Sequence, residues 1–351
     1  MPFVIWAQRH HSVATTRAMD SAATHGHLRL VQWLHRNRHE GCTTEAMDGA
    51  AAHGHFEIVL WLHENRTEGC TDQACFMAAI RGHLDVAQWL YETRCATFPL
   101  NTFDHVCANG HLEVAQWLSA NRIGGGSTDA FDWAAAQNHL RVVKWLHNNR
   151  SEGCTVLAID SAACHGHFDT VCWLSKNRPE QCSTNAIDHA AGNGHLAIIR
   201  YLDALRLGGF TAAAMDNAAR GGHLDVVQWL HVHENAEGCT TEAMDGAAAH
   251  GHRGVVEWLN CHRSEGGTSR GVDAAAVNGN RAILEFFRLI RDEQLSDVAF
   301  RECVIRGDLH TARWIAVHFN AVVDMQVVFD HADANGWTGA IVDTAFVGHA
   351  Q

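Results

Sequence analysis

Residues 43–66 read TTEAMDGAAAHGHFEIVLWLHENR, and this stretch decides the fold. Thr43 is a suitable helix N-cap, because its hydroxyl can accept a hydrogen bond from a backbone N–H of the first turn. Small and apolar residues then recur at helical spacing as far as Ala51, and Gly54 offers the left-handed conformation that often ends a helix. A second apolar stripe, which includes Trp61, follows Gly54. The stretch predicts two short helices joined by a glycine turn.

The same unit recurs with a period of 28 residues, apart from one step of 29. An aromatic residue lies six positions after the second residue of each Gly-His pair, and a Thr or Ser lies twelve positions before it, except at Pro99. The pairs, including degraded copies, lie at residues 26–27, 54–55, 82–83, 110–111, 138–139, 166–167, 194–195, 222–223, 251–252, 279–280 and 307–308. Three patterns in phase predict an all-α solenoid of about eleven stacked helix-turn-helix units with short loops.

The two ends of the chain depart from this unit. Residues 1–14 look like the tail of a second helix, so we expect a partial N-terminal capping helix there and the repeat array over residues 15–318. The pattern blurs in residues 319–351, which predicts a divergent C-terminal capping repeat, because terminal units must close a stack with something atypical. A start in mid-unit is also what a fragment of a longer repeat protein would show.

The pattern A-A-x-x-G-H-L-x-V-V-x-W-L resembles the ankyrin repeat, most clearly over residues 50–62 and 218–230. The resemblance covers roughly residues 12–318 and implies stacked helix pairs that bind other proteins. The ankyrin period is about 33 residues and includes a β-turn finger. Because this unit is shorter, we expect little or no finger. The resemblance also implies that the residues just before Gly-His lie on a concave face and contact the partner.

The residue directly before the glycine of each pair gives the candidate protein-binding positions. These positions are polar, uncharged to mildly basic, and rich in histidine. They are His25, His53, Arg81, Asn109, Gln137, His165, Asn193, His250 and Asn278. The alternative, that they are merely solvated residues under weak selection, stays open. Residues 40–55 and 237–252 are identical, and such internal duplication is compatible with that alternative.

Composition limits the partners and the location. A formal net charge of −13 does not favour nucleic acid, since phosphate binding needs clustered Lys and Arg. There is no signal peptide in residues 1–11 and no run of 18 apolar residues, so no membrane span is expected. The twelve Cys form no C-x-x-C pair, and several recur one repeat apart, too far for a disulfide. Reduced thiols predict an intracellular, cytoplasmic protein, and we expect a monomer.

An Asp recurs once per unit in the predicted first helix, where the ankyrin pattern has a His. We expect each carboxylate to accept a hydrogen bond from a His or a backbone donor of its own or the adjacent unit. Phe76 and Arg301 are the exceptions. The series is Asp20, Asp48, Asp104, Asp132, Asp160, Asp188, Asp216, Asp245 and Asp273.

Other repeated residues have structural interpretations. The Trp line is expected to form the core, and the Arg line that includes Arg66 is expected to cap the second helices. Four His-Gly-His triplets, such as that at His53, straddle a helix break and lack the cysteine pair of a zinc site. Since no G-x-S-x-G, P-loop or G-x-G-x-x-G pattern occurs, we expect no catalytic site, no cofactor and no metal.

The sequence therefore predicts a protein-interaction scaffold rather than an enzyme. The alternative is an adaptor or effector fragment of a larger protein, whose recruiting domain lies outside this chain. The 28 His residues also motivate a pH-sensing hypothesis, which equal unfolding midpoints at pH 7.5 and 5.5 would refute.

Overall fold

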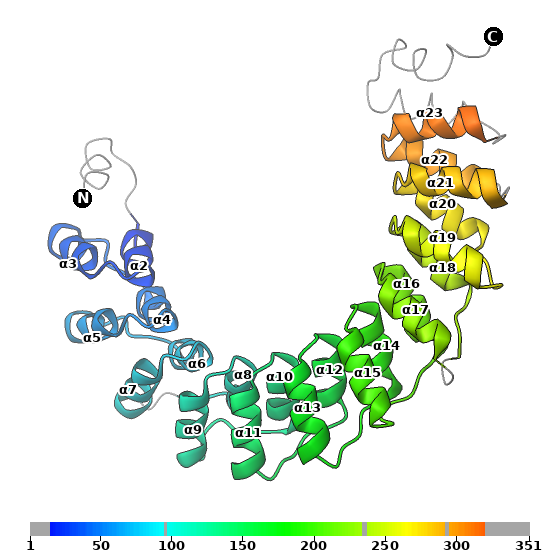
Figure 1. The fold of residues 1–351 in the computed structure, drawn as a ribbon. Coiled ribbons are helices and arrows are strands. Elements are labelled where there is room, and N and C mark those ends of the chain that lie inside the picture. Colours follow the sequence, from blue (N-terminus) through cyan, green and yellow to red (C-terminus); the bar gives the residue numbers. More distant parts are fainter. Residues whose placement is uncertain (1–14, 95–96, 234–236, 292–294, 320–351) are drawn as a thin grey trace, which may run out of the picture. The chain divides into compact units, whose positions relative to one another are not determined.

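The computed structural model describes residues 15–94, 97–233, 237–291 and 295–319. Within these residues the chain forms eleven helix pairs and no strand (Figure 1). The prediction of an all-α solenoid of helix-turn-helix units without β-fingers is therefore confirmed. The expected caps at residues 1–14 and 319–351 fall outside the described residues, except for Phe319.

The first helix of each pair begins after the predicted N-cap and ends before the glycine. The first helices are α2 (Arg17–Thr24), α4 (Thr44–Ala52), α6 (Asp72–Ile80), α8 (Thr102–Ala108), α10 (Thr128–Ala136), α12 (Leu157–Cys164), α14 (Thr184–Gly192), α16 (Ala212–Gly221), α18 (Thr241–Ala249), α20 (Ser269–Val277) and α22 (Asp297–Ile305).

The second helix of each pair begins directly after the His, or its replacement, that follows the glycine. The second helices are α3 (Leu28–Asn37), α5 (Phe56–Asn65), α7 (Leu84–Arg94), α9 (Leu112–Ala120), α11 (Leu140–Asn149), α13 (Phe168–Asn177), α15 (Leu196–Ala204), α17 (Leu224–Val232), α19 (Arg253–His262), α21 (Arg281–Phe286) and α23 (Leu309–His318). A short π-helix, η1 (Phe287–Arg291), continues α21.

The helices cluster into two compact units, residues 1–162 and 163–351. In the first unit α2, α4, α6, α8 and α10 pack each against the next. In the second unit α14, α16, α18, α20 and α22 do the same. Each of these ten first helices also packs against its own second helix, so both units have a layer of first helices and a layer of second helices (Figure 1).

Small residues and short aliphatic residues make up the core between the layers. Ala50 and Ala51 of α4 are fully buried. In α5 Val59 is fully buried and Leu62 is 1% exposed. Alanines let neighbouring helices approach closely, and each buried Val or Leu contributes about 1.5–3 kcal/mol. The expectation that the tryptophans form this core is wrong in part. Trp61 is only half-buried, because it lies at the outer edge of the second-helix layer.

Candidate interaction surface

Hydrogen bonds between adjacent repeats fix the first helices. The Asp of one repeat accepts two bonds from the N-cap residue of the next, one from its backbone N–H at 2.7–3.4 Å and one from its hydroxyl at 2.5–3.1 Å. We call these pairs the Asp–hydroxyl ladder: Asp20–Thr43, Asp48–Thr71, Asp104–Ser127, Asp132–Thr155, Asp188–Thr211, Asp216–Thr240, Asp245–Thr268 and Asp273–Ser296.

The hypothesis of an Asp ladder is thus confirmed for these eight residues. In each of them the N-cap residue of the adjacent repeat donates from its backbone N–H and its hydroxyl. The same hydroxyl caps its own helix, as when Thr43 Oγ1 accepts from the N–H of Glu45 at 3.2 Å. Burial raises the pKa of Asp48 and Asp188, and the bonds from Thr71 and Thr211 partly offset that effect. The carboxylates are therefore structural groups already occupied by donors.

The ladder is interrupted once inside the first unit. Phe76 replaces the Asp in α6, and Pro99, 23 residues later, replaces the hydroxyl partner. Both members of one pair are therefore lost together. Aromatic side chains fill the junction instead: Tyr91 and Phe98 lie 5.7 and 6.0 Å from the ring of Trp117, centre to centre.

The histidine of each Gly-His pair also links adjacent repeats. In the regular repeats its ring lies against the glycine of the preceding one: a Cβ on Gly54 would come within 2.4 Å of His83. The backbone of Ala52 raises the pKa of His83, and that of Ile80 raises the pKa of His111, but burial outweighs this and lowers both. Glycine is thus required twice here, by a φ of +72° and by the approaching imidazole. The sequence predicted only the first reason.

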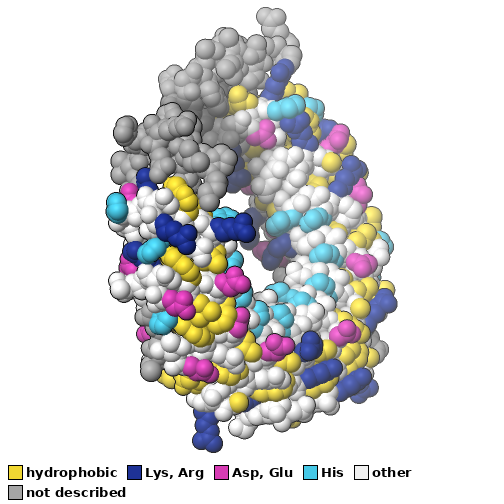
Figure 2. All heavy atoms as spheres, turned by 90° about the vertical axis from the view of Figure 1, so that its left-hand side faces the viewer, with side chains coloured by type: hydrophobic (Ala, Val, Ile, Leu, Met, Phe, Trp, Pro, Cys, Tyr) yellow, Lys and Arg dark blue, Asp and Glu magenta, His cyan; other side chains and the backbone are white. Residues whose placement is uncertain are grey.

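All nine candidate binding residues directly follow the last residue of a first helix, and all are exposed. We call them the C-cap row. The first unit holds His25, His53, Arg81, Asn109 and Gln137, and the second holds His165, Asn193, His250 and Asn278. Histidine side chains recur one repeat after another over the surface in Figure 2.

Several members of the row hydrogen-bond to the preceding repeat. Asn109, Asn193 and Asn278 donate to the last carbonyl of the preceding first helix at 2.8–3.0 Å. Arg81 donates at 3.2 Å both to the carbonyl of Ala52 and to Nε2 of His53. The row is therefore held in place by these contacts while its side chains stay exposed.

The histidines of the row have a defined tautomer. In His53 and His250, Nδ1 lies 2.9 Å from the backbone carbonyl four residues earlier, so Nδ1 carries the proton. His25 makes the same contact at 2.8 Å. In the neutral ring Nε2 is then left as a hydrogen-bond acceptor. His25 and His250 therefore present acceptors, whereas the Nε2 of His53 already accepts from Arg81, and the asparagines present donors.

The His-Gly-His triplets form stacked ring pairs. His25–His27, His53–His55, His165–His167 and His250–His252 have ring centres 5.8–6.4 Å apart and planes within 20° of each other. Among the residues that the structure describes, no three His, Cys, Asp or Glu side chains are placed to hold a metal ion.

The arginine line forms ion pairs instead of a basic ridge. Arg66 pairs with Glu68, Arg150 with Glu152 and Arg263 with Glu265, each two residues apart. Arg66 itself is the extended residue that follows α5. Each glutamate neutralises the charge of its arginine, as its place two residues later in the sequence indicates.

The outer edge of the second helices is aromatic. His35, His63 and His231 each contact the Trp of the next repeat edge-on, with ring centres 4.9–5.1 Å apart. The half-buried tryptophans therefore join successive second helices, and they sit on a different layer from the C-cap row.

Several of the cysteines are poor nucleophiles. Eleven of them lie among the described residues and all are free thiols. Burial raises the pKa of Cys75 to about 12 and those of Cys239 and Cys303 to about 11. These three thiols are protonated at neutral pH, whereas nucleophilic chemistry needs the thiolate.

Comparison with known families agrees with this architecture. Residues 19–63, 47–91 and 131–175 each match the family model of ankyrin repeats (many copies). None of the curated proteins compared with the chain matches it. No helix in the described ranges has both the length and the apolar character needed to cross a bilayer.

Proposed function

Because this chain is an ankyrin-repeat protein, we propose that it is a scaffold that binds a protein partner through the C-cap row. Ankyrin repeats are generally protein-interaction modules. The observation that carries the proposal is that nine equivalent positions are all exposed, all at the end of a first helix, yet differ in side chain. The neighbouring ladder and Gly-His positions vary far less.

The chemistry of the row favours a polar, extended partner surface. His25 and His250 offer acceptors, and the asparagines and the remaining N–H groups of Arg81 offer donors, so backbone N–H and C=O groups of a partner can be matched along the row. Repeat stacks use such extended surfaces for macromolecules. The proposed activity is therefore binding and not catalysis.

A matched pair of triple variants tests this proposal. The row variant is His53→Ala, Arg81→Ala and Gln137→Ala. The control variant changes exposed residues of second helices in the same unit: Arg36→Ala, Glu64→Ala and Lys144→Ala. Proteins captured by the tagged wild type from cell extract, quantified by mass spectrometry, define the set to be compared.

We expect the row variant to lose a defined subset of these proteins and the control to keep it. Both variants should keep the wild-type melting temperature within a few degrees, since surface substitutions usually change stability by less than about 0.5 kcal/mol. Equal capture by the wild type and the row variant would refute the proposal.

We also propose that the protein is monomeric and cytoplasmic, which the free thiols of the described cysteines support. Light scattering at micromolar concentration tests the first, and imaging of a tagged chain in its native cell tests the second.

A further inference from the structure

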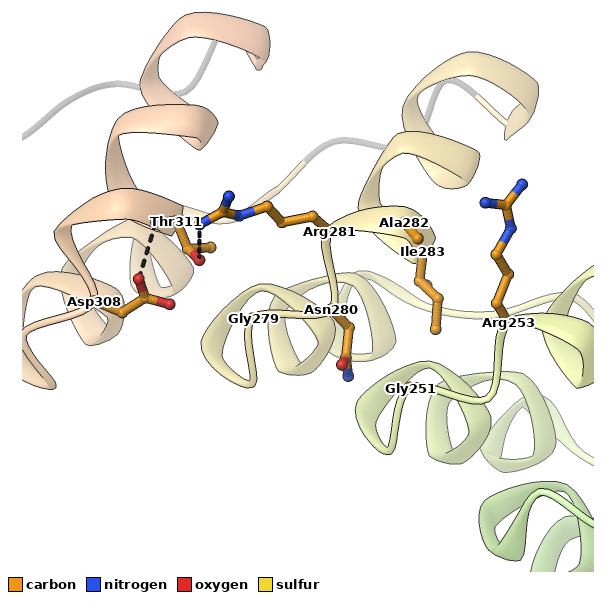
Figure 3. A pocket seen from close by; sticks show the side chains of 9 residues that line it. All are labelled: Gly251, Arg253, Gly279, Asn280, Arg281, Ala282, Ile283, Asp308 and Thr311. Carbon is orange, nitrogen blue, oxygen red and sulfur yellow. Dashed lines mark hydrogen bonds between the residues drawn. The ribbon is translucent and has the colours of Figure 1, made fainter.

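A pocket of about 470 Å³ lies in the second unit across the start of α19, α21 and α23 (Figure 3). Its lining includes Arg253, Asn280, Arg281, Ile283, Asp308 and Thr311. The volume falls within the range of about 300–1,000 Å³ that is usual for ligand pockets. Figure 3 shows Arg281 extending toward Thr311, with Asp308 next to Thr311, and Arg253 at the opposite end of the lining.

The pocket exists because two imidazole rings are missing. In the regular repeats the histidine after the glycine fills this space, but here Asn280 and Asp308 take its place. A Cβ on Gly110 would meet His139 at 2.4 Å, whereas a Cβ on Gly279 would have no atom nearer than Asp308 Oδ2, at 3.6 Å.

The first unit provides an internal comparison. An equivalent groove, lined by Gly110, His111, Glu113 and Arg141 among others, has a volume of about 240 Å³. In repeat register His111 corresponds to Asn280. The pocket in the second unit is thus the same surface feature with about twice the volume.

The charge of the pocket also differs from that of the groove. Arg281, at the position of Leu112, contacts two neutral acceptors: Nε2 of His310 at 3.1 Å and Oγ1 of Thr311 at 3.5 Å. Within the described part of the chain it pairs with no carboxylate. Its guanidinium is therefore available to an anionic group.

The other charged groups are less available. Asp308 accepts from the backbone N–H of Thr311 at 3.0 Å. Against the effect of burial, the bonds from Thr311 together with the charge of Arg281 lower the pKa of Asp308, so a ligand carboxylate must share Arg281 with it. Arg253 on the opposite side pairs with Glu257 at 2.6 Å, but both side chains are largely exposed, so this pair is weak. The chain as a whole carries −13, yet residues 249–318 contain nine arginines and nine acidic residues. The region around the pocket is thus neutral overall, whereas the rest of the chain is acidic.

We propose that this pocket binds a carboxylate of the protein partner, either an acidic side chain or a free C-terminus. The proposal rests on the proposed function, because Asn278 and His250 of the C-cap row directly precede two glycines of the lining. A peptide that follows the row reaches the pocket. Arg281 then donates to the carboxylate, while Ile283 and Thr311, each 1% exposed, form the floor beneath it.

The test uses a random decapeptide library, displayed once with a free C-terminus and once internally, and selected on the whole chain. Enriched peptides are synthesised with a fluorescent label, and their affinity is measured by fluorescence polarisation. Each is compared with its Glu→Gln or Asp→Asn form and with its C-terminal amide, so that the two sources of carboxylate are distinguished.

Two variants remove the site in different ways. Asn280→His with Asp308→His refills the space with the rings that the regular repeats carry, and Arg281→Gln keeps the shape but removes the charge. We expect each to weaken binding about ten- to a hundredfold, the effect of losing a hydrogen bond to a charged group. Thermal melting by circular dichroism confirms that both fold.

A matched control opens the equivalent groove of the first unit. His111→Asn with His139→Asp enlarges that groove without supplying an arginine at Leu112, and we expect it to bind the selected peptides no better than wild type. Enriched peptides without a required carboxylate, equal affinity for the refilled variant, or no enrichment would each overturn the pocket proposal. Loss of partner proteins in the row variant alone would leave the proposed function standing.

Discussion

Replacing Asp216 by Ala tests whether the Asp–hydroxyl ladder stabilises the stack. Asp216 is 8% exposed and accepts from the Thr240 N–H at 2.8 Å and from its hydroxyl at 2.7 Å. The substitution leaves that N–H without its acceptor, at a cost of about 1–3 kcal/mol, and removes a second bond to a charged group. Relief of the buried charge offsets part of this. We expect a net loss of about 2–3 kcal/mol at the contact between α16 and α18.

Hydrogen exchange measured by mass spectrometry can localise that loss. Each repeat contacts only its neighbours, so the effect should concentrate in peptides from residues 211–250. A loss of 2–3 kcal/mol corresponds to exchange about 30- to 150-fold faster there. Asp216→Asn should give a smaller increase, because the amide oxygen still accepts from Thr240.

Asp225→Ala is the matched control. Asp225 lies in the same repeat and carries the same charge, but it is exposed in the first turn of α17. Its loss should cost only about 0.3–1 kcal/mol through the helix dipole. If Asp216→Ala and Asp225→Ala accelerate exchange equally, or if the acceleration is spread over all repeats, the ladder does not hold the stack together.

Three further predictions follow from the contacts between repeats. Phe76→Asp with Pro99→Thr should restore the missing pair, so the double variant should be more stable in urea than the sum of the two single changes by about 1–3 kcal/mol. Additive effects would contradict this. Gly54→Ala should destabilise by more than 1 kcal/mol, given its φ of +72° and the nearby imidazole, whereas Gly254→Ala, with nothing within 4 Å, should stabilise by up to about 1 kcal/mol. Burial lowers the pKa of His83 and four equivalent histidines below the ordinary value of 6.5. The free energy of unfolding should therefore keep its full value above pH 6.5 and decrease as the pH falls from 6.5 toward the lower folded-state pKa. An unfolding midpoint that is the same at pH 7.5 and 5.5 would refute this.

The helix pairs could be predicted from the sequence because each boundary has a local physical cause. Thr43 caps the start of α4, and Gly54 permits the positive φ that follows its end. These causes recur every 28 residues, so one correct unit gives the rest of the array. The 28-residue period does not show which residue each repeated side chain contacts. The Asp and hydroxyl lines were both visible, and their joint loss at Phe76 and Pro99 was the signal that they form pairs.

The pocket could not be predicted because it depends on a packing contact that sequence alone does not show. Asn280 and Asp308 look like degraded copies of the Gly-His pattern. Only the position of the His139 ring, against Gly110, shows that a smaller side chain leaves space. The prediction that the tryptophan line forms the core was wrong in part for a related reason. A stripe at helical spacing predicts burial, but the outer edge of the second-helix layer leaves each ring partly exposed.

The C-cap row can vary because the scaffold does not depend on it. The contact that the row residue makes changes from repeat to repeat: Asn109 donates to the carbonyl of Ile80 in the preceding repeat, whereas Nδ1 of His53 and of His250 bonds to a carbonyl of its own helix. No single contact of the row is therefore shared by all repeats. His, Arg, Asn and Gln can therefore exchange at this position with little effect on folding. Selection for a partner can act on the row separately from selection for the stack, which is why the scaffold is predictable from one unit and the identity of the partner is not.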